Sequence, residues 1–391
     1  MLNINTCSRS SAPIIRKNFA KTLASAYSDL MKSVFSIVAI LLIAFLAYLF
    51  LWPVPINPMP WDAPINRGYV DDYASNEDLA GLTRIDLSPH HGPEDIVALD
   101  NGRLLTATQE GFILTVDPVS GSVDIMAETG GVPLGMEYRA STNSLIVADA
   151  HKGLLEIGLD GSVEVLTDDV DGTPILYADD LDIGEDGIIY FSDASTKFGA
   201  KANGTTMEAS LLEIMEGDGT GRLLAFDPST DTTRVILDGL VFPNGVAVSA
   251  DGDILMTVTG RYQVLKINPK TGESDVLIDN LPGFPDNINR GPDDTFFVGL
   301  VSPRSDWLDD NADNPFMRRL AMRLPAFMRP QAQAYGLILQ INAGGDILRT
   351  WHDPDGQYLT PTGAVVVPTP DGDRMYITSL LSPDLGYRSY P

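Results

Sequence analysis

A short pattern that returns six times along the chain constrains the fold more than any other sequence feature. Each copy opens on a Pro or a small residue and runs into an apolar stretch, and a second apolar stretch follows about ten residues later. The copies begin at Pro93, Pro133, Ala178, Pro243, Pro285 and Pro361. A unit of roughly forty residues built from short strands is typical of a β-propeller. The sequence therefore predicts an all-β fold, a six-bladed β-propeller over residues 80–391.

Residues near the two ends of this region are expected to share the last blade. Residues 82–87 alternate between apolar and polar side chains, as a half-buried strand does. Little chain remains after the sixth copy, so we expect this early strand to complete the sixth blade and close the ring. Two insertions, 197–221 and 306–334, lengthen the third and fifth units.

The second insertion contains a short helix, which is predicted over 315–324. Asn314 followed by Pro315 is a favourable helix start, and Pro325 ends the pattern. One face is apolar and the other is basic, with Met317, Leu320 and Leu324 on the first and Arg318, Arg319 and Arg323 on the second. A basic amphipathic helix in an acidic domain is typical of contact with a membrane surface. The alternative is a helix packed on the rim of the propeller, where it covers the site.

An uncharged segment near the N-terminus predicts a membrane anchor. Residues 33–52 form an apolar run without a charged side chain, which is long enough to cross the ~30 Å hydrocarbon core of a bilayer. No small-residue cleavage site follows it, so we interpret it as an uncleaved anchor. The basic tail, residues 1–32, should then be cytoplasmic. Residues 53–79 are expected to be a linker, which places the propeller on the extracytoplasmic side.

Charge and cysteine content exclude several classes of function. The net charge of the chain is −27, and the basic tail makes the remainder more acidic still. Such a surface repels phosphate backbones, so no nucleic-acid partner is expected. The one cysteine, Cys7, lies in the predicted tail. Thiol catalysis and zinc–thiolate sites are therefore excluded for the propeller. Asn203 begins a glycosylation sequon whose use the sequence does not decide.

Oxygen-bearing side chains recur at the second position of the repeat. The residues at this position are Glu94, Leu134, Asp179, Asn244, Asp286 and Thr362. First strands line the central channel of a propeller and begin at one face, so four oxygen ligands should converge there. Asn287 lies directly behind this ring. Because two carboxylates in one small volume repel each other, such a ring is expected to hold a cation.

The donor set favours calcium. Carboxylate and amide oxygens without His or Cys are the ligands of a hard cation, with Ca²⁺ preferred and Mg²⁺ as the alternative. The metal ligands predicted from the pattern are Glu94, Asp179, Asn244, Asp286 and Asn287. The opposing interpretation is that acids and amides at strand starts only satisfy turns, as Asp and Asn often do.

A calcium ion with an open position can polarise an ester or lactone carbonyl while a base activates water. Asp286 is one candidate base. His151, which ends a second strand on the same face, is the other candidate, and a plain surface-loop histidine is its alternative interpretation. Arg261, Tyr262 and Arg304 also end second strands on this rim and are predicted to bind substrate.

The segments that carry these residues resemble a known superfamily. The matching segments are 91–95 (HGPED), 148–154 (ADAHKGL), 190–195 (YFSDAS), 215–217 (MEG), 221–224 (GRLL), 242–247 (FPNGVA), 281–288 (LPGFPDNI) and 352–356 (HDPDG). Together they are similar to the six-bladed calcium propellers that include gluconolactonases, regucalcin and paraoxonases. The resemblance is greatest to the branch of the strictosidine synthase-like and adipocyte plasma membrane-associated proteins. It covers about residues 80–380.

This resemblance implies calcium bound at Glu94, Asn244 and Asp286, and lactonase or arylesterase activity as in the hydrolytic relatives. Three departures limit it. Relatives carry Asn-Asp where this chain has Asp179-Asp180, which makes the site here more anionic. Residues 357–370 contain no acid to match the glutamate of the alkaloid-condensing synthase, so a strictosidine-type condensation is rejected. The paraoxonase histidine dyad is not reproduced, since only His151 lies near a suitable place.

Two functions follow as expectations. The first is a membrane-anchored, calcium-dependent hydrolase of lactones or esters. The second is a non-catalytic, membrane-tethered propeller that binds a ligand or a protein, with structural calcium.

Overall fold

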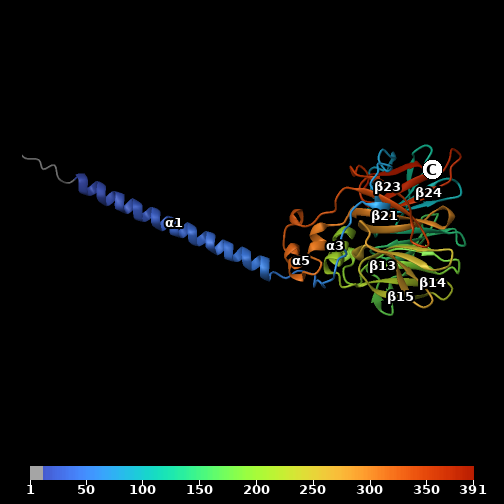
Figure 1. Ribbon diagram of the computed structural model, residues 1–391, viewed down its shortest axis with the longest axis horizontal. Helices are drawn as coiled ribbons and strands as arrows, with labels where there is room; N and C mark the ends of the chain where they lie inside the picture. The colour runs from blue at the N-terminus through green and yellow to red at the C-terminus, as the bar shows by residue number, and fades with distance from the viewer. Residues whose placement is uncertain (1–11) are drawn as a thin grey trace, which may run out of the picture. The chain divides into compact units, whose positions relative to one another are not determined.

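The computed structural model describes residues 12–391, with side chains from residue 16 onward; Cys7 and the first part of the basic tail lie outside the described residues. It confirms the six-bladed β-propeller (Figure 1). Each blade is a four-stranded antiparallel sheet, and the sheets follow one another around the ring in chain order. The second-strand runs expected from the repeat are found as the second strands of the blades.

The first three blades contain the following strands. Blade one consists of β2 (Ile96–Ala98), β3 (Leu104–Ala107), β4 (Phe112–Val116) and β5 (Val123–Glu128). Blade two consists of β6 (Pro133–Arg139), β7 (Ser144–Asp149), β8 (Gly153–Gly158) and β9 (Val163–Thr167). Blade three consists of β12 (Ala178–Ile183), β13 (Ile189–Asp193), β14 (Gly221–Asp227) and β15 (Thr232–Leu240). A small ribbon, β10 (Asp169–Val170) with β11 (Thr173–Pro174), precedes blade three.

The remaining blades close the ring. Blade four consists of β16 (Pro243–Val248), β17 (Ile254–Val258), β18 (Gln263–Ile267) and β19 (Ser274–Ile278). Blade five consists of β20 (Gly283–Arg290), β21 (Thr295–Pro303), β22 (Gly336–Asn342) and β23 (Ile347–Asp353). Blade six consists of β24 (Pro361–Val367), β25 (Arg374–Ser379), β26 (Asp384–Ser389) and the early strand β1 (Thr83–Asp86). Ile85 pairs with Leu385 across β1 and β26, which confirms the predicted closure.

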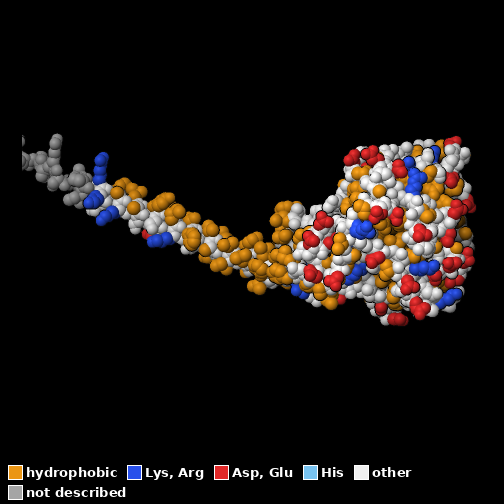
Figure 2. Space-filling model, in the orientation of Figure 1, with side chains coloured by type: hydrophobic (Ala, Val, Ile, Leu, Met, Phe, Trp, Pro, Cys, Tyr) orange, Lys and Arg blue, Asp and Glu red, His pale blue; other side chains and the backbone are white. Residues whose placement is uncertain are grey.

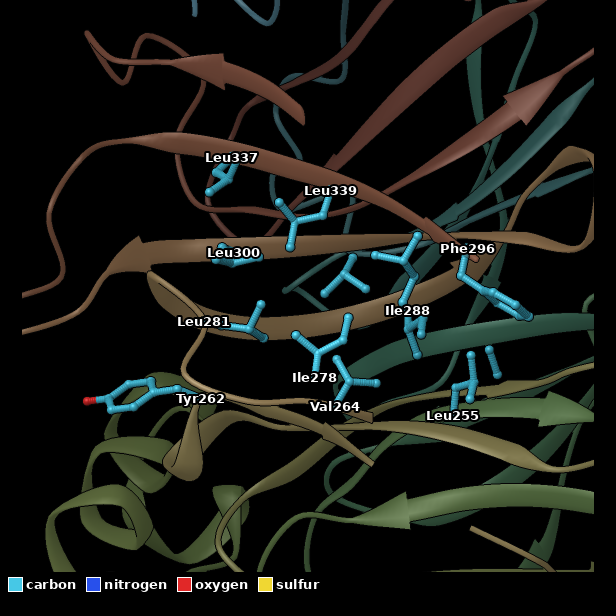
Figure 3. Packing of buried hydrophobic residues seen from close by; sticks show 13 residues of the cluster. Leu255, Tyr262, Val264, Ile278, Leu281, Ile288, Phe296, Leu300, Leu337 and Leu339 are labelled. Atoms are coloured by element: carbon cyan, nitrogen blue, oxygen red, sulfur yellow. The ribbon is translucent and has the colours of Figure 1, made fainter. Parts of the chain in front are cut away.

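The core lies between the blades. The largest cluster of buried side chains fills the space between blades four and five, where Val264 and Leu255 face Ile288 and Phe296 (Figure 3). Inner strands such as β17 are buried on both faces, because they are covered by a blade on each side. Burial of this apolar area, at about 25 cal/mol per Å², is the main force that joins neighbouring blades.

The two insertions of the propeller carry most of its helices. Lys197–Gly221 holds α2 (Ala200–Asn203) and α3 (Thr206–Glu216), and 306–334 holds α4 (Asp306–Asp310), α5 (Pro315–Met322) and a 3₁₀ turn, η4 (Ala326–Met328). Three further 3₁₀ turns are η1 (Asp71–Tyr73), η2 (Thr259–Arg261) and η3 (Pro292–Asp294). The hydroxyl of Thr205 accepts from the amide of Glu208 and caps the start of α3. Gly217, at φ 67°, ends this helix in the left-handed region.

The chain divides into two compact units. The smaller consists of residues 1–54 with 320–328, and its main element is α1 (Ala12–Leu51). Residues 16–51 form the one described helix long and apolar enough to span a membrane. Apolar side chains such as Phe35 and Ile43 are exposed all along it (Figure 2). Residues 33–51 of the expected segment 33–52 therefore lie within a candidate transmembrane span that begins earlier, at Arg16, and ends at Leu51.

The second part of α5 and the residues after it belong to the unit of α1. There the Tyr48 hydroxyl donates to the carbonyl of Arg323 at 2.8 Å, and the Arg323 guanidinium donates to the carbonyls of Trp52 and Leu49 at 2.6 and 3.1 Å. Arg323 therefore binds protein carbonyls and is not displayed on a free polar face.

The larger unit begins at Pro55, so most of the expected linker is part of the propeller body. The amide of Asn57 donates to the carboxylate of Glu216 at 2.7 Å, and the amide of Met59 donates to the Glu216 carbonyl at 2.8 Å. The amide of Trp61 donates to the carbonyl of Ala312 at 3.1 Å. A Pro-rich composition does not reveal these bonds, because the partners are more than a hundred residues away.

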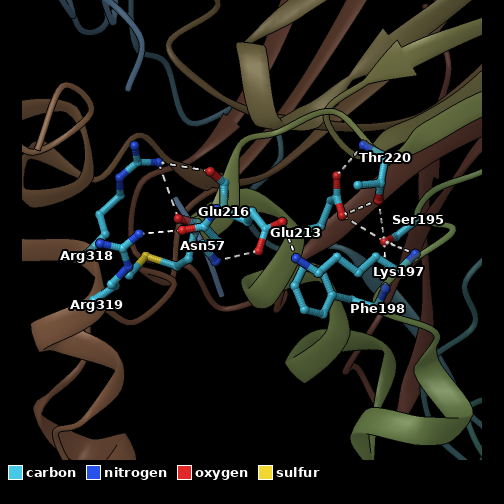
Figure 4. Close-up of polar contacts among 10 residues, drawn as sticks. Asn57, Ser195, Lys197, Phe198, Glu213, Glu216, Thr220, Arg318 and Arg319 are labelled. Atoms are coloured by element: carbon cyan, nitrogen blue, oxygen red, sulfur yellow. Dashed lines mark hydrogen bonds and ion pairs between the residues drawn. The ribbon is translucent and has the colours of Figure 1, made fainter. Parts of the chain in front are cut away.

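Arg318 contradicts the expectation of a basic face available to lipid. Its side chain is fully buried, at 0% exposure, and donates to the carbonyls of Met215, Met59 and Ala312 (Figure 4). Arg319 donates to the side chain of Asn57. Two of the arginines that suggested membrane contact therefore join the second insertion to the rest of the propeller body. Contact of the helix at 315–324 with a membrane stays a prediction.

Candidate functional site

An irregularity repeated in the first strands shapes the centre of the propeller. In five of the six blades the pairing of the first and second strands shifts by one residue at the same place, so that two residues oppose one. Such a β-bulge releases its residues from the regular ladder and re-aims their side chains. The bulged pairs are Leu134-Gly135, Asp179-Asp180, Asn244-Gly245, Asp286-Asn287 and Thr362-Gly363, and Glu94-Asp95 precede β2 at the equivalent place.

The structure brings four of the predicted metal ligands together at the floor of one pocket. Glu94, Asp179, Asn244 and Asp286 all line it, and each is at least 95% buried. The Asn244 amide donates to Oδ1 of Asp286 at 2.5 Å. Asn287, predicted directly behind the ring, donates to Oε1 of Glu94 at 2.8 Å. These contacts confirm that the repeat positions converge, as the register predicts.

Five buried oxygens in this ring and directly behind it have no hydrogen-bond partner. They are Oε2 of Glu94, Oδ2 of Asp179, Oδ1 of Asn244, Oδ2 of Asp286 and Oδ1 of Asn287. An unpaired oxygen buried in a protein costs about 1–3 kcal/mol. Five in one place, one from each predicted ligand, form a set of hard oxygen donors of the kind that calcium takes.

Burial and mutual repulsion raise the pKa values of the carboxylic acids in this ring. Burial, then the charges of Asp286 and Asp179, raise the pKa of Glu94 well above its ordinary value. Burial and the charge of Asp286 do the same to the pKa of Asp179. Burial raises the pKa of Asp286 to about 7, against the opposing effect of the Asn244 hydrogen bond. The ring is therefore a site where negative charge is costly, and a bound cation would lower that cost.

As the side chains stand, no group of three or more His, Cys, Asp or Glu among the described residues is arranged to hold a metal ion. The donor set fits calcium in its chemistry, through the five unpaired oxygens, but the carboxylates are not grouped as ligands. Calcium binding at this ring is therefore a proposal.

A second layer behind the ring holds the blades in register. Oδ2 of Asp95 in blade one accepts from the amide of Met136 in blade two at 2.8 Å. Oδ2 of Asp180 in blade three accepts from the amide of Val246 in blade four, also at 2.8 Å. The second bulge position therefore alternates around the ring between Asp or Asn and Gly. A Cβ on Gly135 would lie 2.3 Å from Oδ1 of Asp180, and one on Gly245 would lie 2.6 Å from the main-chain carbonyl oxygen of Asp286, so these two glycines leave room for the neighbouring blade. This alternation is visible in the sequence and was missed.

His151, the alternative base, is not brought to the pocket. It does not line the cavity; its amide donates to Oδ1 of Asp149 at 2.9 Å, and its Nε2 is buried without a partner. Burial lowers the pKa of its ring. The reason is local: β7 ends at Asp149, and the turn to β8 carries the histidine away from the floor.

The three predicted substrate-binding residues also lie outside the pocket. Tyr262 is buried and donates from its hydroxyl to Asp309 at 3.0 Å, while Arg304 donates to the same carboxylate and lies over the Tyr262 ring. Arg261 donates to the carbonyl of Gly217 and lies over the ring of Trp61. These side chains fix the insertion and the 55–61 segment to the rim. The ends of second strands did face the rim as expected, but the insertions cover them.

The walls of the pocket come from elements that the repeat pattern does not describe. The cavity, of about 140 Å³, is lined mainly by apolar side chains. α3 contributes Met207, Leu211 and Ile214, and the second insertion contributes Leu308 and residues 330–333. The amphipathic periodicity of 206–216 was the available signal for α3.

Comparison with known proteins assigns the chain to a family. The strictosidine synthase model matches residues 179–262, and the model of the N-terminal part of strictosidine synthase-like proteins matches residues 71–116. Strictosidine synthase-like protein 7 of Arabidopsis thaliana is 32% identical over 72% of this chain and 76% of the relative. The adipocyte plasma membrane-associated protein of Rattus norvegicus is 30% identical over 82% of this chain and 90% of the relative. The chain belongs to the strictosidine synthase-like family.

One strictosidine synthase-like relative matches a smaller part of the chain at a higher identity. Protein 13 of Arabidopsis thaliana is 36% identical over 64% of this chain, and the chain spans 63% of that relative's length.

Solved structures show the same fold at low identity. A gluconolactonase from Xanthomonas campestris superposes with a TM-score of 0.55 at 15% identity, over 85% of this chain and 97% of that one. A calcium-binding protein, regucalcin, from Agrobacterium tumefaciens superposes with a TM-score of 0.52 at 12% identity, over 79% and 96%. This strictosidine synthase-like protein therefore has the propeller of the gluconolactonase and regucalcin type.

Proposed function

We propose that this protein is a membrane-anchored, calcium-dependent hydrolase of lactones or esters. The strongest support is a set of five unpaired, buried oxygens, one each on Glu94, Asp179, Asn244, Asp286 and Asn287. The first four of these residues line the floor of a pocket. The fold shared with a gluconolactonase and with the calcium-binding regucalcin agrees with it. α1 would supply the anchor, with the propeller on the extracytoplasmic side.

Glu94, Asn244 and Asp286 would hold the calcium, with Asp179 and Asn287 beside them. When bound, calcium supplies a Lewis acid for a carbonyl oxygen. The resemblance to the calcium propellers implies an amide at the position of Asp179, so this site would have one more negative charge than that pattern.

Asp286 is the base of the proposed reaction. Its carboxylate lies at the pocket floor, held from one side by the Asn244 amide. It accepts a proton from water as the water oxygen bonds to the carbonyl carbon of the substrate. The bond from that carbon to the ring or ester oxygen then breaks, and the leaving oxygen takes the proton back. The products are a hydroxy acid from a lactone, or an acid and an alcohol from an ester.

The second candidate is a propeller that binds a ligand without turnover. It is favoured by the position of His151 outside the pocket, since no described lining residue is then a histidine that could activate water. In that case calcium would serve stability alone.

The deciding experiment is hydrolysis of a panel of lactones and aryl esters by the full chain in lipid nanodiscs, with calcium supplied or chelated. We expect turnover that is lost with chelator and restored by calcium. Asp286→Asn should lower kcat at least a hundredfold, whereas Asp238→Asn, at an exposed position, should leave it unchanged. Undiminished turnover in the first variant would exclude Asp286 as the base, and no turnover by the folded wild type would favour the binding module.

A further inference from the structure

Helix α3 presents two different apolar faces. Ala209 and Leu212 are buried, and the carboxylate of Glu213 on the same side accepts from Ser195 and Thr220 (Figure 4). Met207, Leu211 and Ile214, spaced i, i+4 and i+7, line the pocket instead and are not fully buried. Residues at this spacing share one side of a helix. One face of α3 therefore holds the helix in place, and the other forms an apolar wall of the cavity.

Most of the remaining wall is also apolar, and its polar side chains are hydroxyls and the amides of Gln331 and Gln333. Leu134, Phe242, Phe284 and Leu308 line the cavity together with residues 301–303. None of the described residues that line it is Lys, Arg or His, so the charges at the cavity are the three acids of the floor. A substrate that carried a carboxylate or phosphate would find no cationic side chain to pair with, and the three acids, when ionised, carry more charge than the one calcium ion proposed there.

The lining hydroxyls are largely committed to the protein. Ser210 donates to the carbonyl of Met207 at 2.9 Å, Thr259 donates to that of Pro285 at 2.6 Å, and Ser302 donates to that of Pro303 at 3.1 Å. A polyhydroxylated molecule would lose its hydrogen bonds to water on entry and find few free hydroxyl partners to replace them here, which disfavours its binding.

We propose that the pocket selects neutral lactones or esters with an apolar alkyl or aryl tail, and that Met207, Leu211 and Ile214 set the preference for the tail. This inference deepens the proposed function and rests on it for the reacting group. The acids of the floor face the polar end of the substrate, and the tail lies along α3. Polyhydroxylated sugar lactones are then poor substrates, although the fold is that of a gluconolactonase.

The test uses the full chain in nanodiscs with neutral γ-lactones whose alkyl tails grow from one to seven methylenes, and with glucono-1,5-lactone. Burial of each methylene should raise kcat/KM about fourfold until the cavity is full. Glucono-1,5-lactone should be at least a hundredfold poorer than the best alkyl lactone. Either a flat dependence on tail length or a preference for glucono-1,5-lactone would overturn the proposal.

A matched pair of variants assigns the preference to α3. Leu211→Asn should flatten the dependence on tail length and leave kcat/KM for the shortest lactone within about twofold. Val276→Asn, a change of similar kind at an exposed site on β19, should leave the whole series unchanged. Because both variants are compared in the same nanodiscs, partition of substrate into lipid cancels. An unchanged series in Leu211→Asn would remove α3 from the proposal.

The affinity of a ligand that is not hydrolysed tests the apolar pocket separately from the hydrolase proposal. 3-Alkylcyclopentanones, in which a methylene replaces the ring oxygen of a lactone with its tail on the γ-carbon, cannot be hydrolysed, and calorimetry can measure their affinity. Tighter binding with longer tails in a protein without turnover would reject the proposed function and retain the apolar pocket. Weak binding independent of tail length would reject the pocket inference whether or not esters are hydrolysed.

A separate observation points to Thr360. Its backbone has φ 42°, a conformation that a β-branched residue rarely adopts. Its hydroxyl is buried without a partner, its side chain lines the cavity, and the residue is 8% exposed. Strain of this kind persists where the surrounding structure requires it, often at functional sites. We infer that the Thr360 hydroxyl donates a hydrogen bond to a substrate oxygen.

Thr360→Val and Thr360→Ser test this role against a structural one. The Val variant removes the hydroxyl and should lower kcat/KM about tenfold, whereas the Ser variant keeps the hydroxyl and should retain activity within about twofold. Thr233→Val, at a part-buried hydroxyl outside the pocket that donates to the hydroxyl of Thr167, should leave kcat/KM within about twofold. Equal losses in Thr360→Val and Thr360→Ser would show that only packing matters there.

Discussion

The side-chain amide of Asn244 donates a 2.5 Å hydrogen bond to Oδ1 of Asp286 and so joins blades four and five at the floor of the pocket. The bond leaves Oδ1 of Asn244 and Oδ2 of Asp286 without partners. Two residues that follow equivalent prolines in successive repeats are thereby placed in contact, each with one oxygen free for another ligand. The proposed calcium site depends on this relationship.

Calcium should stabilise the propeller if these oxygens bind it. With calcium at a hundred times its dissociation constant, the free energy of unfolding should rise by about 2.7 kcal/mol, and thermal unfolding in calcium and in chelator measures the difference. Glu94→Gln should lose most of the rise. Asp179→Asn, which removes one charge, should weaken calcium affinity about tenfold.

The control for the calcium experiment is Asp160→Asn, at an exposed turn, which should respond to calcium as the wild type does. Equal stability of the wild type in calcium and in chelator would contradict the site.

Gly245 is expected to tolerate no side chain. A Cβ there would lie 2.4 Å from the amide nitrogen of Ile288 and 2.6 Å from the carbonyl oxygen of Asp286, both main-chain atoms that cannot turn aside. Gly245→Ala should therefore separate blades four and five and lower the free energy of unfolding by about 2–3 kcal/mol. Denaturant unfolding measures this loss.

Gly344→Ala is the matched glycine change. Its Cβ would meet only the side chain of Asn342 closely, at 3.2 Å, so stability should stay within about 0.5 kcal/mol of the wild type. A similar loss of stability in Gly245→Ala and Gly344→Ala would mean that the close approach of blades four and five does not cause the loss in Gly245→Ala.

Arg318 should contribute far more to stability than its neighbour in α5. It is fully buried and donates to three main-chain carbonyls, of which those of Met215 and Met59 belong to distant segments and that of Ala312 to the same insertion. Arg318→Met would leave those carbonyls without their donor, so we expect a loss of about 3 kcal/mol. Arg319→Met removes a partly exposed contact with Asn57 and should cost less than about 1 kcal/mol. Thermal unfolding of the two variants side by side gives the comparison, and equal losses would contradict the buried role.

The buried position of His352 is expected to make the stability of the protein depend on pH. Its ring is buried against Tyr69 and Tyr335, and the Tyr335 hydroxyl lies 2.8 Å from its Nδ1. Burial lowers the pKa of His352 to about 4, against about 6.5 in an unfolded chain. Between these values the unfolded state binds more protons, so stability rises with pH. The contribution is complete above pH ~6.5 and is lost as the pH falls toward ~4.

The expected change across this window is on the order of 1–2 kcal/mol. His352→Gln should remove that part of the pH dependence, as measured by urea unfolding from pH 4 to 7. Tyr335→Phe should keep it, because burial of the ring, the main cause, is unchanged. A slope that is the same in the wild type and in His352→Gln would assign the dependence to other groups.

The sequence by itself determined the propeller and the ring of oxygen ligands. Alternation within strands and the spacing of the repeats are local properties, and closure of the ring then forces equivalent positions onto one axis. Glu94, Asp179, Asn244 and Asp286 could therefore be placed together without coordinates.

The tertiary structure alone decided what surrounds that ring. Rim residues such as Arg261 and Arg304 end second strands as expected, yet the insertions and the 55–61 segment cover them and turn them into structural contacts. α3 becomes a wall of the pocket because Glu213 is bound by Ser195 and Thr220. Such contacts join segments that are not part of the sequence repeat. Their free energy depends on packing across the whole fold, so no local sequence pattern predicts them.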